Sequence, residues 1–370
     1  MATKSKRLVP ARAIHPGEVL REELLERGIK QKDFAKTIGV QPTHLNEFIK
    51  GKRNLNESLA IKLEKALGIS YKNWMSLHSG YLYDCKAIEE ARIEERKACE
   101  FESACNDMFN LNLVYKRLNM SLLPCVDRVA AIKGMLPFDL LSAENLRMQV
   151  AGLYKHSEKV QMDERNMLTW LILNRIKIIH NTPELPNQYK KGNAIEAAWR
   201  ISEMANQRRL SVDGIKACLN GYGIQYINVE KLDRAPIDAF STMSNEHPVI
   251  TVTYRYNDMD KLAFDILHEL CHIDRHLSDD QTAFISVDGL YTNDPMEKEA
   301  NDFARQMLIP DNVWNEIMSM GCKSLSPYKI VKTIAQAAES KGISPSIAVA
   351  RYKHDTNWYN TPSYRSPRIF

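Results

Sequence analysis

The spacing of apolar residues predicts a chain built mostly of helices, with strands only in its C-terminal half. Apolar positions recur at helical spacing in short segments over residues 15–69 and 106–190, and in one longer, charge-rich segment over residues 71–101. β-Branched residues first alternate at residues 224–229 (IQYINV) and 248–256 (PVITVTYRY), after which helical spacing returns. We therefore expect a mainly α multidomain protein with an all-α N-terminal part, a helical middle region and a C-terminal α+β domain containing a small sheet.

Changes in this pattern divide the 370 residues into four predicted segments, because a chain of this length exceeds one ordinary hydrophobic core. They are a flexible basic arm (1–13), a helical module (14–84), a helical linker or dimerisation region (85–190) and the α+β domain (191–370). The two prolines in NTPELPN make residues 181–187 the best linker candidate. The third segment carries no metal or nucleophile motif, so a plain spacer and a partner-binding element both stay open.

The net charge of +4 is unevenly distributed along the chain. Residues 1–70 carry 14 Lys and Arg against 8 Asp and Glu, whereas the remaining residues carry 36 against 38. A basic module attached to a nearly neutral body indicates a polyanionic partner for that module. The alternative is a basic face that only contacts solvent.

The cysteines and the N-terminus indicate an intracellular protein. The seven cysteines are irregularly spaced and form no CxxC pair, which favours reduced thiols over a disulfide framework. The first residues lack an apolar signal core, and no run of 18 apolar residues occurs. We therefore expect a cytoplasmic location and no membrane partner.

The segment QKDFAKTIGVQPTHLNEFIKGKR, residues 31–53, has the pattern of a helix-turn-helix. Ala35 is small where two helices cross closely, Gly39 allows the positive φ of the turn, and Pro42 suits the start of the second helix. The core-facing positions of that second helix are Leu45, Phe48 and Ile49. A further predicted helix ends at Gly68 and has on one face Leu59, Leu63, Ala66 and Leu67.

The other positions of the second helix carry hydrogen-bonding side chains of the kind that read base edges in the major groove. They are Gln41, Thr43, His44, Asn46, Glu47 and Lys50. Lys50, Lys52 and Arg53 are also expected near phosphates, where cations add salt-dependent affinity. The pattern therefore predicts binding to double-stranded DNA. The alternative is a small helical bundle with a polar surface.

Three short motifs extend this pattern into a family resemblance. They are the HPGE sequence at the start of the module, the GKR after the second helix, and the W-x-x-L formed by Trp74 and Leu77. With them, residues 14–84 resemble the HigA-type antitoxin branch of the lambda-repressor-like (XRE) helix-turn-helix family. The resemblance implies a homodimeric repressor that binds an operator, often its own promoter, and that neutralises a toxin protein in a toxin–antitoxin system.

A second pattern lies in FDILHELCHIDRHL, residues 264–277, which contains an H-E-x-x-H motif. On a helix, His268 and His272 share one face, so both imidazoles can reach a single zinc ion. Glu269 stands beside the first of them, where a carboxylate can take a proton from water. The apolar residues around the motif predict a buried helix. The alternative is therefore a pair of core histidines without a metal.

A zinc site needs a third protein ligand, and the segment MEKEANDFARQMLIP offers two carboxylates. Its apolar face contains Ala300, Phe303, Ala304 and Met307. Glu297 lies three residues before Ala300 and shares that face, whereas Glu299 is turned further round the helix. Spacing therefore favours Glu297 and leaves Glu299 open.

The sequence H-E-L-x-H followed by E-x-E-A-N-x-F-A resembles the double signature of the ImmA/IrrE-type metallopeptidases, and the likeness covers roughly residues 195–355. The resemblance implies that His268 and His272 bind Zn²⁺, that Glu269 is the catalytic base, and that Glu297 is the third ligand. Cys271 stands where that family usually has glycine. It is either a redox-sensitive thiol or, as we favour, a small buried filler.

As a peptidase, such a domain is expected to hydrolyse an amide bond of a protein substrate, with Glu269 activating water. Candidate residues for stabilising the oxyanion are His276, Tyr254 and Tyr291. We expect the substrate to pair as an edge strand along residues 248–254, and the polar segment 278–294 to form a loop over a cleft.

Three interpretations of the whole chain follow. The first is a DNA-binding repressor or antitoxin with a zinc-dependent peptidase domain. The second is a DNA-binding regulator whose metal site is structural or sensory, and the third is a regulator with an inactive relic of a peptidase. The presence of both histidines, Glu269 and Glu297 argues against the third. A purely structural site has no need of Glu269, which favours the first.

Overall fold

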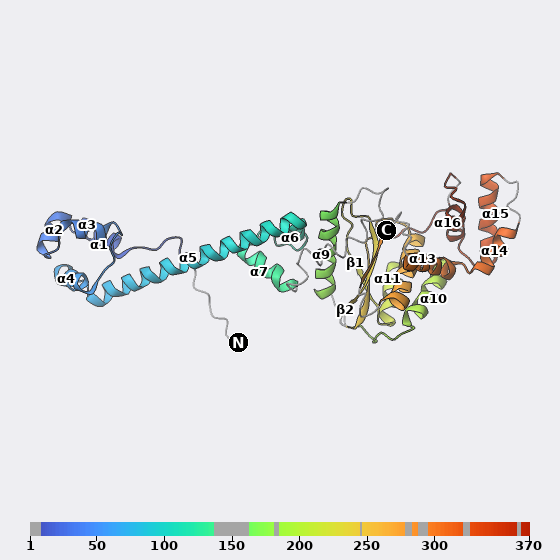
Figure 1. The fold of residues 1–370 in the computed structure, drawn as a ribbon, viewed down its shortest axis with the longest axis horizontal. Coiled ribbons are helices and arrows are strands. Elements are labelled where there is room, and N and C mark those ends of the chain that lie inside the picture. Colours follow the sequence, from blue (N-terminus) through green and yellow to red (C-terminus); the bar gives the residue numbers. More distant parts are fainter. Residues whose placement is uncertain are drawn as a thin grey trace. The chain divides into compact units, whose positions relative to one another are not determined.

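The computed structural model describes residues 9–136, 163–180, 185–244, 246–277, 283–287, 295–320, 326–360 and 364–370 (Figure 1). The chain forms two compact units, one of residues 1–102 with 124–126 and one of residues 103–123 with 127–370. The structure confirms the predicted fold class, which is mainly helical with a small mixed sheet in the C-terminal part. Within the described residues, no helix has the length and apolar character needed to cross a bilayer.

The first unit contains a helix-turn-helix. Its helices are α1 (Pro16–Glu26), α2 (Gln31–Thr37), α3 (Pro42–Ile49), α4 (Glu57–Leu67) and the long α5 (Tyr71–Met108), which begins in this unit. The predicted arm falls partly outside the described residues, since residues 1–8 are not among them. The α5 helix begins where the sequence predicted a long helix, and it continues seven residues beyond the predicted end at residue 101.

The turn between α2 and α3 forms as predicted, because Gly39 has a φ of 60°. Ala35 is fully buried where α2 and α3 meet, and the predicted core residues of α3 are buried with it. Gly51 has a φ of 70° and ends α3, while Gly68 adopts the left-handed conformation after α4. One core prediction was wrong: Ala66 is exposed, since α4 turns Ala60 inward at the i, i+3 and i+7 spacing.

The middle of the chain is helical, as predicted. Its described helices are α6 (Leu111–Arg117), α7 (Cys125–Met135) and α9 (Glu164–His180). Pro124 directly precedes α7. The first half of the predicted linker, residues 181–184, lies outside the described residues.

The second unit is built around a four-stranded mixed sheet. Its strands are β1 (Gln225–Asn228), β2 (Ile237–Ser244), β3 (His247–Val252) and β4 (Ala283–Val287), in the spatial order β1-β3-β2-β4. β1 pairs in parallel with β3, and the other neighbours are antiparallel. The helices after α9 are α10 (Asn193–Asn206), α11 (Val212–Gly221), α12 (Met259–Cys271), α13 (Pro295–Leu308), α14 (Asp311–Ser319), α15 (Pro327–Ser340) and α16 (Pro345–Thr356), with a π-helical turn η2 (His272–His276) after α12.

Two predictions about this sheet were wrong. β3 has neighbours on both sides, so residues 248–252 cannot accept a substrate strand. Among the strands that the structure describes, β1 and β4 are the outer ones. Residues 283–287, predicted as part of a loop, form β4, because their backbone pairs with β2. The rest of the predicted loop lies outside the described residues.

Helices cover both faces of the sheet (Figure 1). On one face α9 packs against β2, where the rings of Trp170 and Phe240 meet edge to face at 6.1 Å. On the other face α12 contacts β2 and is itself covered by α10 and α13. This layered arrangement buries α12 almost completely. The H-E-x-x-H motif therefore lies in the interior of the unit.

Candidate metal centre and nucleic-acid interface

The α12 helix holds both histidines of the motif on one buried face. It begins at Asp258, whose side chain accepts a hydrogen bond from the backbone N–H of Lys261 and so caps the helix. Ten residues further, His268 is 4% exposed, and His272 at the end of the helix is fully buried. The i, i+4 spacing that predicted a shared face brings the two Nε2 atoms within 2.9 Å of each other.

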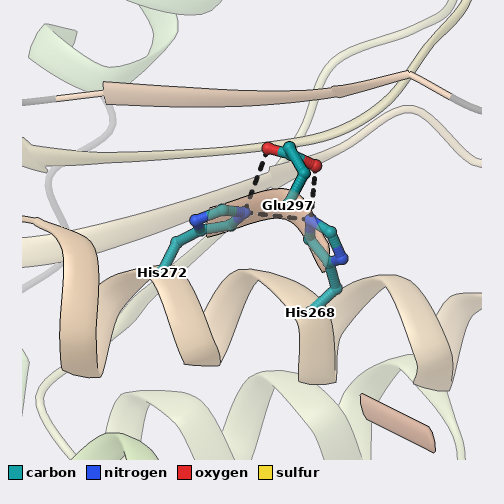
Figure 2. A group of neighbouring side chains, drawn as sticks. All are labelled: His268, His272 and Glu297. Carbon is teal, nitrogen blue, oxygen red and sulfur yellow. Dashed lines mark hydrogen bonds and ion pairs between the residues drawn. The ribbon is translucent and has the colours of Figure 1, made fainter. Parts of the chain in front are cut away.

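Glu297 on α13 completes a cluster with these imidazoles (Figure 2). Its two carboxylate oxygens lie 3.2 Å from His268 Nε2 and 3.3 Å from His272 Nε2. One ligand atom from each of these three residues lies within 4.8 Å of the others. In the part of the chain that the structure describes, no other set of three or more His, Cys, Asp or Glu side chains converges in this way.

These separations fit a tetrahedral metal ion. Two donor atoms that are each about 2.05 Å from one tetrahedral zinc ion lie about 3.3 Å apart. The three observed separations of 2.9, 3.2 and 3.3 Å are close to that value. Two imidazole nitrogens and a carboxylate oxygen are also a donor set that zinc accepts. The residues present therefore fit zinc, with one position of the tetrahedron left open.

A second group of side chains orients the imidazoles. His268 Nδ1 lies 3.1 Å from the side-chain oxygen of Asn301, and since that amide oxygen can only accept, Nδ1 carries the proton. On the other side, His276 Nε2 donates to the Glu299 carboxylate at 3.1 Å, and the Nδ1 atoms of His272 and His276 are 2.8 Å apart. A neutral His276 must then accept from His272 Nδ1. The Nε2 atom of each cluster histidine is left facing Glu297, and in its unprotonated form it offers the lone pair that a metal ligand needs.

The two carboxylates that sequence spacing left open therefore occupy different places. Glu297 lies in the cluster with its side chain 20% exposed. Glu299 is 46% exposed and forms ion pairs with Arg275 at 2.5 Å and with His276. The arrangement holds Glu299 behind His272, outside the metal cluster.

The electrostatics of the cluster favour a bound cation. Burial raises the pKa of Glu297, but hydrogen bonds from His268 and His272 outweigh burial and lower that pKa to about 2. Burial lowers the pKa of His268, but the hydrogen bond to Glu297 and the charge of Glu269 reverse this, so the pKa is raised overall. Three groups that attract positive charge thus converge at one buried point.

Glu269 follows His268 on α12 and is fully buried. A cavity adjoins the metal cluster and is described below. His268 and Glu297 line that cavity, whereas Glu269 does not. Glu269 therefore does not open onto that cavity in this structure.

A cavity of about 520 Å³ opens beside the cluster. α12 contributes Lys261, Phe264 and Asp265 to its lining, α13 and α16 form further walls, and the segment 364–366 closes one side. This volume lies in the range of small-ligand and peptide side-chain sites. The cavity thus joins the candidate metal centre to a space where part of a substrate fits.

A partly buried ion pair lies in the wall of this cavity. Lys261 lies 2.6 Å from Asp265 and 3.5 Å from Asp238, which also pairs with Arg255. Burial raises the pKa of Asp265 to about 7, and the neighbouring Lys261 ammonium opposes that effect. Sequence reasoning missed this group, although the i, i+4 spacing of Lys261 and Asp265 indicates a pair on one helix face.

Of the three candidates for oxyanion stabilisation, the structure describes His276 and Tyr254, and both make other contacts. His276 contacts His272 and Glu299, and the hydroxyl of Tyr254 hydrogen-bonds that of Tyr226 at 2.8 Å. Neither lines the cavity beside the cluster, and Tyr291 lies outside the described residues. Cys271 is fully buried, and burial raises the pKa of its thiol to about 12, as expected for the small filler that we favoured.

The predicted DNA-contacting residues gather on and after α3. Gln41, Thr43 and His44 are exposed, as are Lys50, Lys52 and Arg53. Asn46 and Glu47 are half-buried, and Glu47 forms an ion pair with Arg53 at 3.4 Å. The helix therefore presents polar side chains at its N-terminal end and cations after its C-terminal end. The pairing with Glu47 reduces the positive charge that Arg53 offers to a phosphate.

Sequence reasoning also missed Asn301 and the orienting role of His276 and Glu299. A usable signal was present, because Asn301 follows Glu297 by four residues and His276 follows His272 by four. Each pair shares a helix face.

Comparison with known proteins identifies both modules. Residues 20–72 match the model of a helix-turn-helix family, and residues 223–345 match the model of the IrrE N-terminal-like domain. Virulence-associated protein I of Dichelobacter nodosus is 34% identical over 79 residues, which are 21% of this chain and 71% of that protein. The uncharacterised HTH-type transcriptional regulator YddM of Escherichia coli (strain K12) is 29% identical over 66 residues, 18% of this chain and 70% of that protein. A helix-turn-helix for double-stranded DNA and an IrrE-like domain thus occur in one transcriptional regulator.

Proposed function

Because this chain belongs to the helix-turn-helix family that includes virulence-associated protein I, we propose that it is a DNA-binding repressor or antitoxin whose IrrE-like domain is a zinc-dependent peptidase. The observation that carries the catalytic part is the convergence of His268, His272 and Glu297 beside the 520 Å³ cavity, with Glu269 next to the first ligand. We further propose that residues 14–84 bind DNA, residues 85–190 act as linker or dimerisation region, and residues 191–370 form the peptidase domain.

In this proposal His268, His272 and Glu297 hold the zinc ion. A bound zinc ion supplies a Lewis acid that polarises a carbonyl and lowers the pKa of water. Glu269 then acts as the base that accepts the proton of the attacking water and passes it to the leaving amine. Asn301, His276 and Glu299 fix the orientation of the imidazoles.

The substrate of this peptidase is proposed to be a protein segment bound as an extended strand. β4 is an edge strand of the sheet and contacts α12, the helix that carries the cluster histidines. An extended peptide can pair with the outer edge of β4, which has no neighbour among the described strands, through main-chain hydrogen bonds. This replaces the interior strand β3, for which the sequence pattern had suggested the same role.

The DNA-binding part follows the HigA-type resemblance. A homodimer that binds an operator and neutralises a toxin protein is supported by the HPGE and GKR motifs and by the polar face of α3. A toxin gene adjacent to the gene of this chain would support that role directly.

A second function is favoured by one observation, the complete burial of Glu269 away from the cavity. A structural or sensory metal site needs the two histidines and Glu297 but no accessible base. In that case the domain binds zinc and cuts no bond.

The experiment that separates the two functions measures zinc content and peptide cleavage together. Wild type, His268→Ala and Glu269→Gln are purified with zinc and incubated with a peptide library derived from a bacterial proteome, and products are identified by mass spectrometry. The peptidase proposal expects about one zinc per wild-type chain, loss of zinc in His268→Ala, and retained zinc with at least ~100-fold slower cleavage in Glu269→Gln. Zinc bound without cleavage by wild type would favour the sensory function, and absence of zinc would exclude both.

A further inference from the structure

Two cysteines outside the metal cluster lie in contact. Cys99 on α5 and Cys125, the first residue of α7, are 26 positions apart, and their Sγ atoms are 3.8 Å from each other. Both belong to the same compact unit. Neither the DNA-binding face nor the metal cluster uses them, so this contact needs its own explanation.

The geometry is close to that required for a disulfide. A disulfide has an S–S distance of about 2.05 Å, so the two sulfur atoms must approach by only ~1.8 Å. Cys125 begins a helix directly after Pro124, at the end of a connecting turn. Formation of the bond requires a side-chain rotation or a shift of that turn that brings the sulfur atoms together.

The two thiols differ in a way that suits a pair of reacting and resolving cysteines. Cys99 is exposed, so a dissolved oxidant can reach its sulfur. Cys125 is half-buried, and its pKa is raised to about 11, first by burial and then by hydrogen bonds with Glu102 and Cys99. Cys125 therefore stays protonated and leaves the first reaction to Cys99.

We propose that Cys99 and Cys125 are a redox site at which a hydroperoxide converts two thiols into an intramolecular disulfide. The Cys99 thiolate attacks one peroxide oxygen and breaks the O–O bond, which gives a sulfenic acid and, after protonation, water. The Cys125 sulfur then attacks the Cys99 sulfur, the S–O bond breaks, and the leaving oxygen departs as a second water. The proton lost by Cys125 passes through the Glu102 carboxylate. In sum, two thiols and hydrogen peroxide give one disulfide and two waters.

In the sequence, the redox site lies between the two matched modules. Residues 99 and 125 lie after the helix-turn-helix match at 20–72 and before the IrrE-like match at 223–345. The disulfide closes a loop that contains α6 and ties the start of α7 to α5. A closed loop restricts the unfolded chain, so oxidation stabilises this region against local opening.

The test is mass spectrometry of the full-length protein after treatment with hydrogen peroxide and alkylation of the remaining thiols. Trypsin leaves Cys99 and Cys105 in one peptide, so a second digestion after Glu100 and Glu102 is needed to separate them. The expected result is a loss of two alkylatable thiols per chain and one linked pair that joins the Cys99 and Cys125 peptides. Local opening, measured by hydrogen exchange of residues 99–125, is expected to slow at least threefold.

Three variants decide the assignment. Cys99→Ser and Cys125→Ser are each expected to abolish the linked pair, whereas Cys85→Ser, the same change elsewhere on α5, is expected to retain it. The proposal fails if wild type keeps all thiols, if the link joins Cys105 or a second chain, or if Cys99 ends as a sulfinic acid with Cys125 still alkylatable.

Discussion

The Nδ1 atoms of His272 and His276 lie 2.8 Å apart, although both side chains come from one continuous turn of backbone. The turn is π-helical, and the N–H of Leu277 donates to the carbonyl of His272 five residues earlier. The wider turn brings His276 behind the ring of His272 and in reach of Glu299. A local departure from the α-helix therefore sets which nitrogen of His272 faces the metal cluster.

We predict that removing the partner of His268 weakens metal binding without unfolding the domain. Asn301→Ala deletes the acceptor of the His268 Nδ1 proton, so the imidazole loses its fixed orientation. Zinc affinity, measured by competition with a coloured chelator, is expected to fall about 10- to 100-fold.

A neighbouring residue on the same helix provides the control for this measurement. The side chain of Asp302 is 47% exposed and forms an ion pair with Arg305, away from the metal ligands, so Asp302→Ala is expected to leave zinc affinity unchanged. If the zinc affinity of Asn301→Ala equals that of wild type and of Asp302→Ala, the Asn301 contact does not orient His268.

The cavity wall is predicted to make stability depend on pH through Asp265. Its pKa rises from 3.8 in the unfolded chain to about 7 in the folded one, because burial disfavours the charged form. Between these two values the native state holds a proton that the unfolded chain has lost, so the contribution of Asp265 to stability is greatest below pH 4, falls between pH 4 and 7 and is constant above that range. Asp265→Asn lacks this titration. Between pH 4 and 7, the free energy of unfolding in urea is expected to fall more in wild type than in Asp265→Asn, by an amount on the order of a few kcal/mol.

The comparison requires metal-free protein, because metal affinity itself depends on pH when ligands must be deprotonated. Wild type and Asp265→Asn are therefore both treated with a chelator, and the change of their unfolding free energies with pH is compared. Asp302→Asn serves as the reference, because the side chain of Asp302 is 47% exposed. Parallel slopes for all three proteins would mean that Asp265 keeps its charge in the fold.

The sequence pattern predicted those features that depend on one helix. The i, i+4 spacing placed His268 and His272 on one face, and the apolar face of the next helix favoured Glu297. The helix-turn-helix was equally accessible, because Ala35 and Gly39 are local requirements of that turn.

Features that depend on pairing between distant segments were not predicted. β2 and β4 carry short mixed sequences, IDAFSTMS and AFISV, whose strand character comes from the neighbours that they pair with. Strand order places β3 inside the sheet, and nothing in its own residues indicates this. Likewise, the direction of Glu299 is set by Arg275 and His276 from another element.

The exposed residues of α3 predict two different effects on DNA binding. Lys52 lies after the helix and is exposed, and its expected contact is a phosphate. Lys52→Ala should weaken binding to all sequences alike and reduce the salt slope by about one unit. His44 is exposed in the first half of α3, where a base contact is expected, so His44→Ala should cost about 1–3 kcal/mol on the preferred sequence and little on other DNA.

Fluorescence anisotropy with a sequence selected from a random pool, measured at several salt concentrations beside an unrelated duplex, distinguishes the two effects. Arg53 is a poorer choice than Lys52 for the phosphate variant, because its ion pair with Glu47 changes along with it. Glu57 at the start of α4 offers a surface control outside α3, since Glu57→Gln changes the charge of an exposed residue of another helix. A Lys52→Ala protein that retains the wild-type salt slope would contradict the phosphate contact. A His44→Ala protein whose affinity falls equally for the selected and the unrelated duplex would contradict the base contact from α3.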